Sequence, residues 1–297
     1  MGRIVVTGAT GFVGNYVVRH LKKTEKAFIG LARPKVPSQY LAEAGHILQG
    51  NLELWLQTIS KVKPETLLLC DWSGVEAKFR DDELQFENVL RWKAMAEMAV
   101  SIGVKKIVAL GSQAEIGILQ DNIDESATIE PRSNYGQAKV KALRVLSSIT
   151  LNSECELVWA RLFSIYGETM SENWFLSKLV KAISEEQALE TSPLTQIWNL
   201  LHVEDCASAL IALSERGTSG IYNVASEKSF RLIELVDLVC ALLKKESQLK
   251  VGAIPLKSNE TLVMRPNIEK LKSLDWNENI DLEDGIRRLV EFKVKKN

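Results

Sequence analysis

A tyrosine and a lysine stand four residues apart in Tyr135-Gly136-Gln137-Ala138-Lys139. Residues at this spacing share one face of a helix, so the sequence predicts an ammonium group beside a phenol. A free phenol has a pKa of about 10 and exchanges protons poorly at neutral pH. Because a nearby positive charge favours the phenolate, we expect Lys139 to lower the pKa of Tyr135 and make it a general acid or base.

Three glycines stand where a first strand meets a first helix, in the sequence TGATGFVG at residues 7–14. Gly8 would allow a tight turn, Gly11 a close approach of the backbone to a pyrophosphate, and Gly14 close packing of the helix on the strand. The helix N-terminus would then present free N–H groups to the phosphates. The loop therefore predicts a dinucleotide cofactor.

The end of the second expected strand selects between the two nicotinamide dinucleotides. An acidic residue there binds the adenosine ribose, whereas an arginine accommodates a 2′-phosphate. This chain has Arg33 and Lys35, and no acidic residue within residues 30–35. Because a guanidinium binds phosphate through two parallel hydrogen bonds, we predict NADP(H). The alternative is an arginine that stacks on adenine and tolerates NAD.

The first half of the chain alternates short apolar runs with helical patterns. Helices are expected over residues 12–23 and 82–102, and strands over residues 3–6, 27–32, 66–70, 107–110 and 156–163. This alternation predicts an α/β fold with a Rossmann-type, doubly wound parallel sheet buried on both faces. Ligands bind at the carboxyl edge of such a sheet.

The pattern is less regular after residue 167. Helices are expected over residues 172–183 and 232–244, strands over residues 198–203 and 221–224, and little periodicity over residues 252–266. We predict an NADP-binding domain from residues 1–165 and 196–226. A smaller α/β substrate domain is expected from residues 166–195 and 227–297.

Composition excludes several classes of protein. Of 297 residues, 46% are hydrophobic and 25% charged, and 37 Lys and Arg face 38 Asp and Glu. Without a basic excess we expect neither a nucleic-acid nor an anionic-membrane partner. No run of about 18 apolar residues predicts a membrane span, and no signal peptide or metal site is expected. The four separated cysteines favour a reducing cytosol, hence a cytoplasmic protein: Cys70, Cys155, Cys206 and Cys240.

The glycine motif, with glycines three residues apart, resembles that of the extended short-chain dehydrogenase/reductases of the NAD-dependent epimerase/dehydratase family. The resemblance implies that Ser112, Tyr135 and Lys139 are catalytic, and that Lys139 also binds the nicotinamide ribose. It implies that Asn88 helps fix the lysine and that Asn51 accepts a hydrogen bond from the adenine amino group. The cofactor-binding set is then Gly8, Thr10, Gly11, Phe12, Val13, Gly14, Arg33, Asn51, Leu52, Trp72, Asn88 and Lys139.

The resemblance extends to the second half of the chain. Residues 160–167 and 201–205 are similar to segments that join the two domains, and Met264-Arg265-Pro266-Asn267 is similar to enzymes acting on nucleotide-activated sugars. Arg265 would then bind the diphosphate, with a surface arginine before a turn as the alternative. The implied substrate-binding residues are Ser112, Gln113, Asn173 and Arg265.

Three features narrow the activity that the resemblance implies. Gln113-Ala114 stands where sugar 4,6-dehydratases carry an Asp-Glu pair, which argues against water elimination. Epimerase-reductases that make fucose nucleotides carry a cysteine where this chain has Ala114. The sequence GSQAE at residues 111–115, residues 172–175 and Trp72 resemble reductases of the CDP-abequose and CDP-paratose synthase kind, although Asp71 replaces a residue that is usually apolar.

These observations predict an NADPH-dependent reductase of the C4 ketone of a nucleotide-diphosphate 4-keto-6-deoxy sugar. Tyr135 would be the proton donor, assisted by Lys139 and Ser112. The alternatives are a nucleotide-sugar 4-epimerase with tightly held NAD and a non-catalytic NADP-sensing protein. The resemblance also implies a homodimer that packs through the helix of Tyr135 and the apolar segment 84–102. The nucleotide, the sugar and the product stereochemistry stay open.

Overall fold

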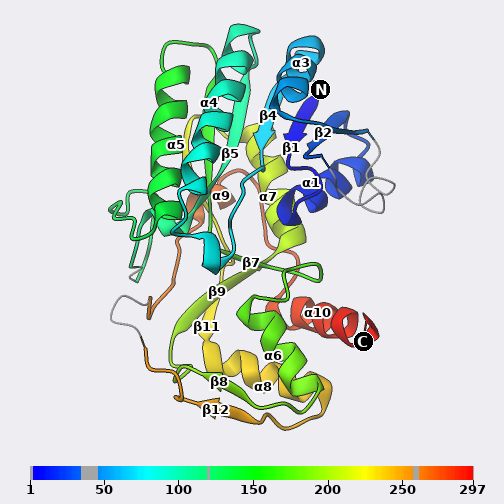
Figure 1. The fold of residues 1–297 in the computed structure, drawn as a ribbon, viewed down its shortest axis with the longest axis vertical. Coiled ribbons are helices and arrows are strands. Elements are labelled where there is room, and N and C mark those ends of the chain that lie inside the picture. Colours follow the sequence, from blue (N-terminus) through cyan, green and yellow to red (C-terminus); the bar gives the residue numbers. More distant parts are fainter. Residues whose placement is uncertain (1–2, 35–45, 119–120, 257–260, 297) are drawn as a thin grey trace.

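The computed structural model describes residues 3–34, 46–118, 121–256 and 261–296. Figure 1 shows two lobes, with the main sheet and its flanking helices in the upper one and helices α6, α8 and α10 in the lower one. Within the described ranges, no helix is both long and apolar enough to cross a lipid bilayer.

Seven parallel strands form the main sheet, in the order β10-β6-β5-β4-β1-β2-β3. Neighbouring β1 and β4 flank the point where the strand order reverses, which opens a crevice at the carboxyl edge. This confirms the predicted Rossmann-type fold. The strands are β1 Ile4–Thr7, β2 Phe28–Ala32, β3 Ile47–Gln49, β4 Thr66–Leu69, β5 Lys106–Ser112, β6 Glu156–Leu162 and β10 Gly220–Val224.

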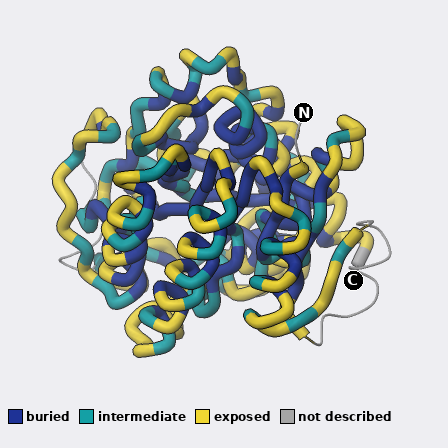
Figure 2. Tube along the Cα trace, turned by 90° about the horizontal axis from the view of Figure 1, so that it is seen from above, coloured by how far each residue is buried: buried dark blue, intermediate teal, exposed yellow. Residues whose placement is uncertain are grey.

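Helices cover both faces of this sheet. Helices α3, α4 and α5 pack side by side, and α1 packs on α7. Seen from above, the strands form a buried layer between more exposed helices (Figure 2). Burial on both faces explains why the central strands are continuous apolar runs. The helices are α1 Phe12–Lys23, α3 Leu52–Val62, α4 Leu84–Ser101, α5 Asn134–Thr150 and α7 Val203–Arg216.

The second lobe is built from shorter elements. Strands β7 (Ser164–Tyr166), β9 (Ile197–His202) and β11 (Ser229–Arg231) form a three-stranded sheet. Strands β8 (Leu189–Thr191) and β12 (Leu249–Val251) pair in parallel. The remaining elements are α6 Phe175–Ser184, α8 Leu232–Leu243, α9 Glu269–Lys272, α10 Leu282–Lys296 and the short 3-10 turns η1 Ala77–Phe79 and η2 Gln113–Glu115.

The buried apolar side chains fall into two clusters. One fills the two faces of the main sheet and includes Met264 and Trp276 from the C-terminal region. The other joins α6, α8 and α10, with Leu179, Leu235 and Leu289 fully buried. The division of the chain into two domains at the boundaries given above stays a prediction.

The expected elements differ from the observed ones mainly at their ends. The strand expected at 107–110 continues to Ser112, and the helix expected from residue 172 begins at Phe175 because the backbone of Trp174 is extended. The strand expected at 198–203 forms β9, which pairs with β7 and β11 and not with the main sheet. Strands β3, β8 and β12 have three residues each and carried no periodic signal.

Candidate active site

Ser112 is the last residue of β5, at the carboxyl edge of the sheet. Its side-chain oxygen accepts a hydrogen bond from Ala114 N (3.2 Å), and its own backbone N–H donates to Glu115 Oε1 (2.6 Å). This reciprocal pair is a capping box, which begins η2 and fixes the serine. The sequence therefore builds a rigid hydroxyl at the end of the strand.

Tyr135 lies in the first turn of α5. Ser133 caps this helix by accepting a hydrogen bond from Gly136 N (3.2 Å). A Cβ on Gly136 would lie 2.3 Å from the backbone oxygen of Ala114, so the glycine lets α5 approach η2. The approach brings Tyr135 within hydrogen-bonding reach of the Ser112 side chain.

The pKa of Tyr135 differs from the sequence-based expectation. Burial raises the pKa of the phenol, and the negative charge of Glu115 raises it further, while the Ser112 hydrogen bond and the Arg80 cation offset only part of the increase. The expectation that Lys139 lowers this pKa is wrong. The Lys139 ammonium lies over the Tyr135 ring, 5.8 Å from its centre, and burial of the phenol outweighs any effect of this charge.

Lys139 is almost completely buried, one helical turn after Tyr135. Its Nζ donates to the backbone oxygen of Leu110 (2.7 Å) and lies 3.6 Å from the centre of a Trp72 ring. Burial lowers the pKa of the amine to about 7, against the opposing effect of nearby Glu115 and Asp71. The lysine therefore changes its charge near neutral pH.

The glycine loop has the geometry that a dinucleotide requires. Gly8 has a positive φ of +64°, and a Cβ there would lie 2.9 Å from the Asp71 backbone. A Cβ on Gly14 would lie 2.2 Å from the backbone oxygen of Gly8, so α1 packs tightly on the loop. Gly11 stands at the N-cap of α1 and has no side chain that could bond the first N–H groups of the helix. The N–H groups from Phe12 and Val13 onward are therefore available to phosphate. These residues fit a dinucleotide cofactor.

The loop also contacts the second lobe. The Phe12 ring packs edge-on against Trp174, with 5.6 Å between ring centres. Tyr16, one turn further along α1, donates to Glu168 Oε2 (2.8 Å). Thr10 lies in the loop between β1 and α1. The start of α1, directly after the glycine loop, therefore contacts the second lobe.

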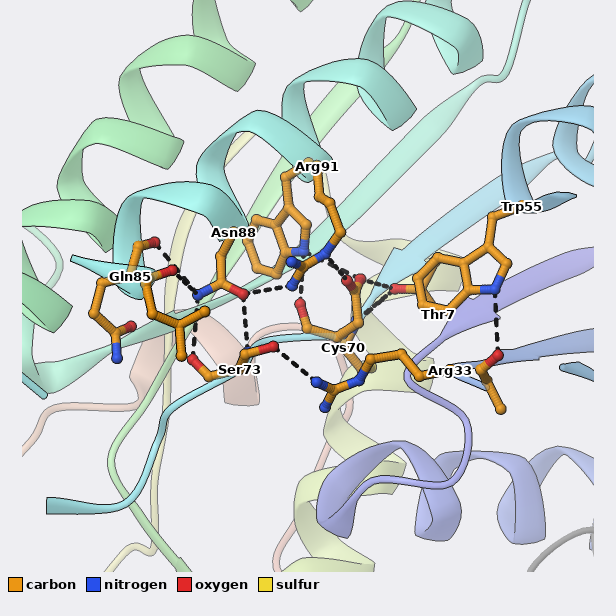
Figure 3. A network of polar contacts seen from close by, with 12 residues as sticks. Thr7, Arg33, Trp55, Cys70, Ser73, Gln85, Asn88 and Arg91 are labelled. Carbon is orange, nitrogen blue, oxygen red and sulfur yellow. Dashed lines mark hydrogen bonds and ion pairs between the residues drawn. The ribbon is translucent and has the colours of Figure 1, made fainter. Parts of the chain in front are cut away.

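A polar network joins the ends of three strands at this edge (Figure 3). Arg33, just after β2, donates through Nη1 to Ser73 Oγ (2.8 Å). The Ser73 backbone N–H donates to Asn88 Oδ1 (2.9 Å), and Arg91 donates to the same oxygen. Arg91 Nε also pairs with Asp71 Oδ2 (3.3 Å). Arg33 thus reaches across the crevice toward the loop that follows β4, and Lys35 lies outside the described residues.

Asp71 is a buried carboxylate beside the glycine loop. It accepts hydrogen bonds from Thr7 Oγ1, Arg91 and Trp92, and burial raises its pKa despite these donors. The sequence marked the position only as a departure from the usual apolar residue. The carboxylate ties β1 to the end of β4, beside Gly8 of the glycine loop.

Glu115 is a second buried carboxylate that sequence reasoning missed. It pairs with Arg161 Nε at 3.1 Å, and both side chains are completely inaccessible to solvent. Trp159 Nε1 also donates to it (3.0 Å). Burial raises the pKa of Glu115, with Arg161 opposing the increase. Because Glu115 also accepts the hydrogen bond from the Ser112 backbone, the Glu115–Arg161 pair helps to fix Ser112. Glu115 and Arg161 are 46 positions apart in the sequence, so no local pattern indicates the pair.

Two predicted cofactor residues have structural partners. Asn51 Oδ1 accepts a hydrogen bond from Leu54 N (3.1 Å) and caps α3, which begins at Leu52. Asn88 exchanges hydrogen bonds with the backbone of Ser73. Its role in fixing Lys139 stays a prediction. Asn88 fixes the loop after β4.

The predicted substrate residues lie at different places. Gln113 adjoins Ser112, and its Oε1 is buried without a hydrogen-bond partner in the described part of the chain. Asn173 Nδ2 donates to Glu76 Oε2 (3.4 Å), from the loop that precedes α4. Arg265 Nη1 pairs with Asp121 Oδ2 (3.0 Å) and is half exposed. Gln113 therefore adjoins Ser112 in the chain, whereas Asn173 and Arg265 each have an acidic protein partner.

Comparison with known proteins identifies the class. A family model described as the NAD dependent epimerase/dehydratase family matches residues 4–225. The chain belongs to this family. The resemblance to the extended short-chain dehydrogenase/reductases is thereby confirmed, together with the expectation of a nicotinamide-dependent oxidoreductase.

Two curated relatives match over nearly their whole length. The chain is 28% identical over 273 residues to the dTDP-6-deoxy-L-talose 4-dehydrogenase (NAD(+)) of Aggregatibacter actinomycetemcomitans, covering 88% of this chain and 98% of the relative. It is 20% identical to the CDP-abequose synthase of Salmonella muenchen, with 98% of each covered.

Solved structures show the same fold. MoeE5 in complex with UDP-glucuronic acid and NAD superposes with a TM-score of 0.87 at 21% identity, over 100% of both chains. The UDP-glucose 4-epimerase of Thermus thermophilus, in complex with NAD, superposes with a TM-score of 0.87 at 18% identity, over 98% of this chain and 99% of that one.

Proposed function

We propose that this protein reduces the C4 ketone of a nucleotide-diphosphate 4-keto-6-deoxy sugar with NADPH. The observation that carries the proposal is the pair of hydroxyls, Ser112 and Tyr135, brought together at the carboxyl edge without an acidic residue at positions 113 and 114. The relatives named as a 4-dehydrogenase of dTDP-6-deoxy-L-talose and as a CDP-abequose synthase support chemistry at this carbon.

The two hydroxyls suit a carbonyl that becomes an alkoxide. Both can donate to the oxygen on which negative charge develops, and Tyr135 can transfer its proton there. Because its pKa is raised by burial, Tyr135 stays protonated at neutral pH and remains a donor. When bound, the dinucleotide supplies the hydride. The glycine loop would hold its pyrophosphate.

Gln113 and Ala114 separate this activity from sugar dehydration. Elimination of water needs an acid and a base near the sugar, and an amide beside a methyl group supplies neither. The unpartnered Gln113 Oε1 suits a hydrogen bond from a substrate hydroxyl, because a buried acceptor gains from finding a donor. Gln113 and Ala114 therefore favour binding of the substrate, and not proton transfer, at this position.

Arg33 supports NADPH as the cofactor. Its guanidinium is exposed at the end of β2 and donates to the neutral hydroxyl of Ser73, which leaves its charge available to a phosphate. NAD is the alternative, since the 4-dehydrogenase relative and the two solved structures are named with NAD.

The test is NADPH consumption against a panel of nucleotide 4-keto-6-deoxy sugars that differ in the base and in the sugar stereochemistry. We expect stoichiometric NADPH oxidation with at least one member. Absence of turnover with every member would reject the proposal.

The second candidate is a nucleotide-sugar 4-epimerase. It is favoured by the superposition on the Thermus thermophilus epimerase, and it uses the same Tyr135 and Lys139 without net redox change. Such an enzyme would carry NAD through purification and interconvert 4-epimers with no added cofactor. Release of the cofactor from denatured protein and its identification by mass spectrometry decides between the two.

A homodimer is the expected assembly. Helix α4 packs along α5 and exposes Leu90, which is 66% accessible, on its outer surface. Because single exposed apolar side chains are ordinary on monomers, this expectation rests on the family resemblance, with which Leu90 is compatible. Light scattering should give twice the mass of the chain, and a monomer at all concentrations would contradict this expectation.

A further inference from the structure

The ammonium group of Lys139 is enclosed by aromatic rings. It lies 3.6 Å from the centre of a Trp72 ring, which follows β4, and 4.5 Å from a Trp92 ring on α4. The two indoles meet edge to face, with 4.8 Å between ring centres. Lys139 donates to the Leu110 backbone oxygen, and indole faces occupy much of the space around its remaining donors.

We propose that Trp72, held in place by Gln85, is a positioning residue: its indole face stabilises the charged form of Lys139, and the same ring packs perpendicular to Tyr135. The ring centres of Trp72 and Tyr135 are 6.3 Å apart and nearly perpendicular. One ring therefore contacts both members of the catalytic pair. The kinetic part of this inference rests on the proposed function, whereas its effect on Lys139 does not.

Gln85 fixes the indole by a complete set of hydrogen bonds. Its Oε1 accepts from Trp72 Nε1 (2.8 Å), and its Nε2 donates to the backbone oxygens of Gly74 (2.7 Å) and Phe79 (2.8 Å). Gln85 is fully buried at the start of α4. The amide thus locks the Trp72 ring to the loop between β4 and α4, so the ring has little freedom to leave the lysine.

The sign of the effect follows from the surroundings of Lys139. A cation over an indole face is attracted by the ring quadrupole, and the attraction is larger where water is excluded. Trp72→Leu keeps an apolar cover and removes the quadrupole. The charged and titratable groups around the lysine and Tyr135 stay in place: Glu115 with its partner Arg161 from β6, Asp71 and Cys70 after β4, Arg91 from α4, and Arg80 near the Tyr135 ring.

The experiment is an NMR titration of Lys139 in protein labelled with ¹³C at the lysine ε-carbon, assigned with Lys139→Met. We expect Trp72→Leu to move the titration midpoint about one pH unit toward acid, because the ring favours the protonated form. Trp72→Phe and Gln85→Ala should move it less in the same direction. If Trp72→Leu does not fold, the midpoints of Trp72→Phe and Gln85→Ala test the same inference.

Trp276→Leu is the matched control. It removes another buried indole with one hydrogen bond, from its Nε1 to Ser208 Oγ (2.9 Å), far along the chain from the lysine. The control should leave the Lys139 midpoint unchanged. An unchanged midpoint in all the Trp72 and Gln85 variants would overturn the inference, and so would a move toward alkaline pH, which would mean that Trp72 acts by excluding water.

Kinetics separate this role from a merely structural one. In Trp72→Leu, the pH profile of kcat should move with the NMR midpoint while KM for the sugar changes little. An equal loss of kcat at every pH would contradict the inference. Because the NMR titration needs no substrate, failure to find a turned-over sugar would reject the proposed function and leave this result standing.

Discussion

The proposed catalytic residues and the proposed binding residues of the crevice differ in how far they are exposed to solvent. Ser112, Tyr135 and Lys139 are at most 8% exposed, and burial raises the pKa of Tyr135 and lowers that of Lys139. Arg33 and Arg265 are exposed and have protein partners, Ser73 and Asp121, that a ligand could replace. Substitutions in the first group should therefore change kcat, stability and pH dependence, whereas those in the second should change KM.

The largest effect should follow removal of the buried phenol oxygen. Tyr135→Phe should lower kcat about 10³-fold, because no other group at that position can supply the proton. The KM for the cofactor should stay within about twofold, since the ring remains. Tyr222→Phe, which removes a buried hydroxyl bonded to Thr218 N (3.2 Å), is the control. Equal losses in both variants would remove the special role of Tyr135.

The buried ion pair beneath Ser112 should dominate stability. Arg161→Leu leaves the Glu115 carboxylate buried without its partner, which costs about 3–5 kcal/mol of the free energy of unfolding. Arg287→Leu breaks an exposed pair with Glu283 on α10 and should cost less than about 1 kcal/mol. Urea denaturation measures both. Similar losses of unfolding free energy in Arg161→Leu and Arg287→Leu would contradict the larger contribution expected of the buried ion pair.

Lys139 should lower stability at acid pH. Its pKa falls from 10.5 to about 7 on folding, so the unfolded chain binds more protons between these values and stability rises with pH across that window. Lys139→Met should therefore be more stable than the wild type by about 4–5 kcal/mol at pH 6, with most of this gain lost by pH 10.

Lys106→Met is the control for this pH dependence. Lys106 is a buried lysine whose Nζ also donates to a backbone oxygen, that of Gly217 (2.6 Å), and it pairs with Glu156. Its removal should give no gain at pH 6. If Lys139→Met gained nothing at pH 6, or gained equally at pH 10, the buried amine would not have the charge behaviour described.

The smallest effect should come from the exposed arginine. Arg33→Ser should raise KM for NADPH about tenfold and leave KM for NADH unchanged, because only the 2′-phosphate is lost as a partner. Arg33→Lys keeps the charge without the paired donors, so its KM for NADPH should lie between those of the wild type and Arg33→Ser. Steady-state kinetics with both cofactors is the measurement. A parallel change for NADH would show that Arg33 contacts a part common to both dinucleotides.

The sequence predicted the features that depend on local spacing. The strand–glycine loop–helix at residues 4–23 and the Tyr135/Lys139 pair on one helix follow from patterns a few residues long. It did not predict the Glu115–Arg161 pair or the Asp71–Thr7 bond, because the two partners of each are 46 and 64 positions apart in the sequence. The expected pKa of Tyr135 was wrong for the same reason: burial is a property of the packed fold, and it outweighed the charge that spacing suggested.

The most direct test of the proposed reduction is the fate of the hydride. With NADPH deuterated at nicotinamide C4 and the sugar that reacts fastest, we predict one deuterium at C4 of the product for each NADPH oxidised, and formation of this product about 10³-fold more slowly with Tyr135→Phe. Conversion of the sugar without net NADPH oxidation, or deuterium at another carbon, would contradict the account.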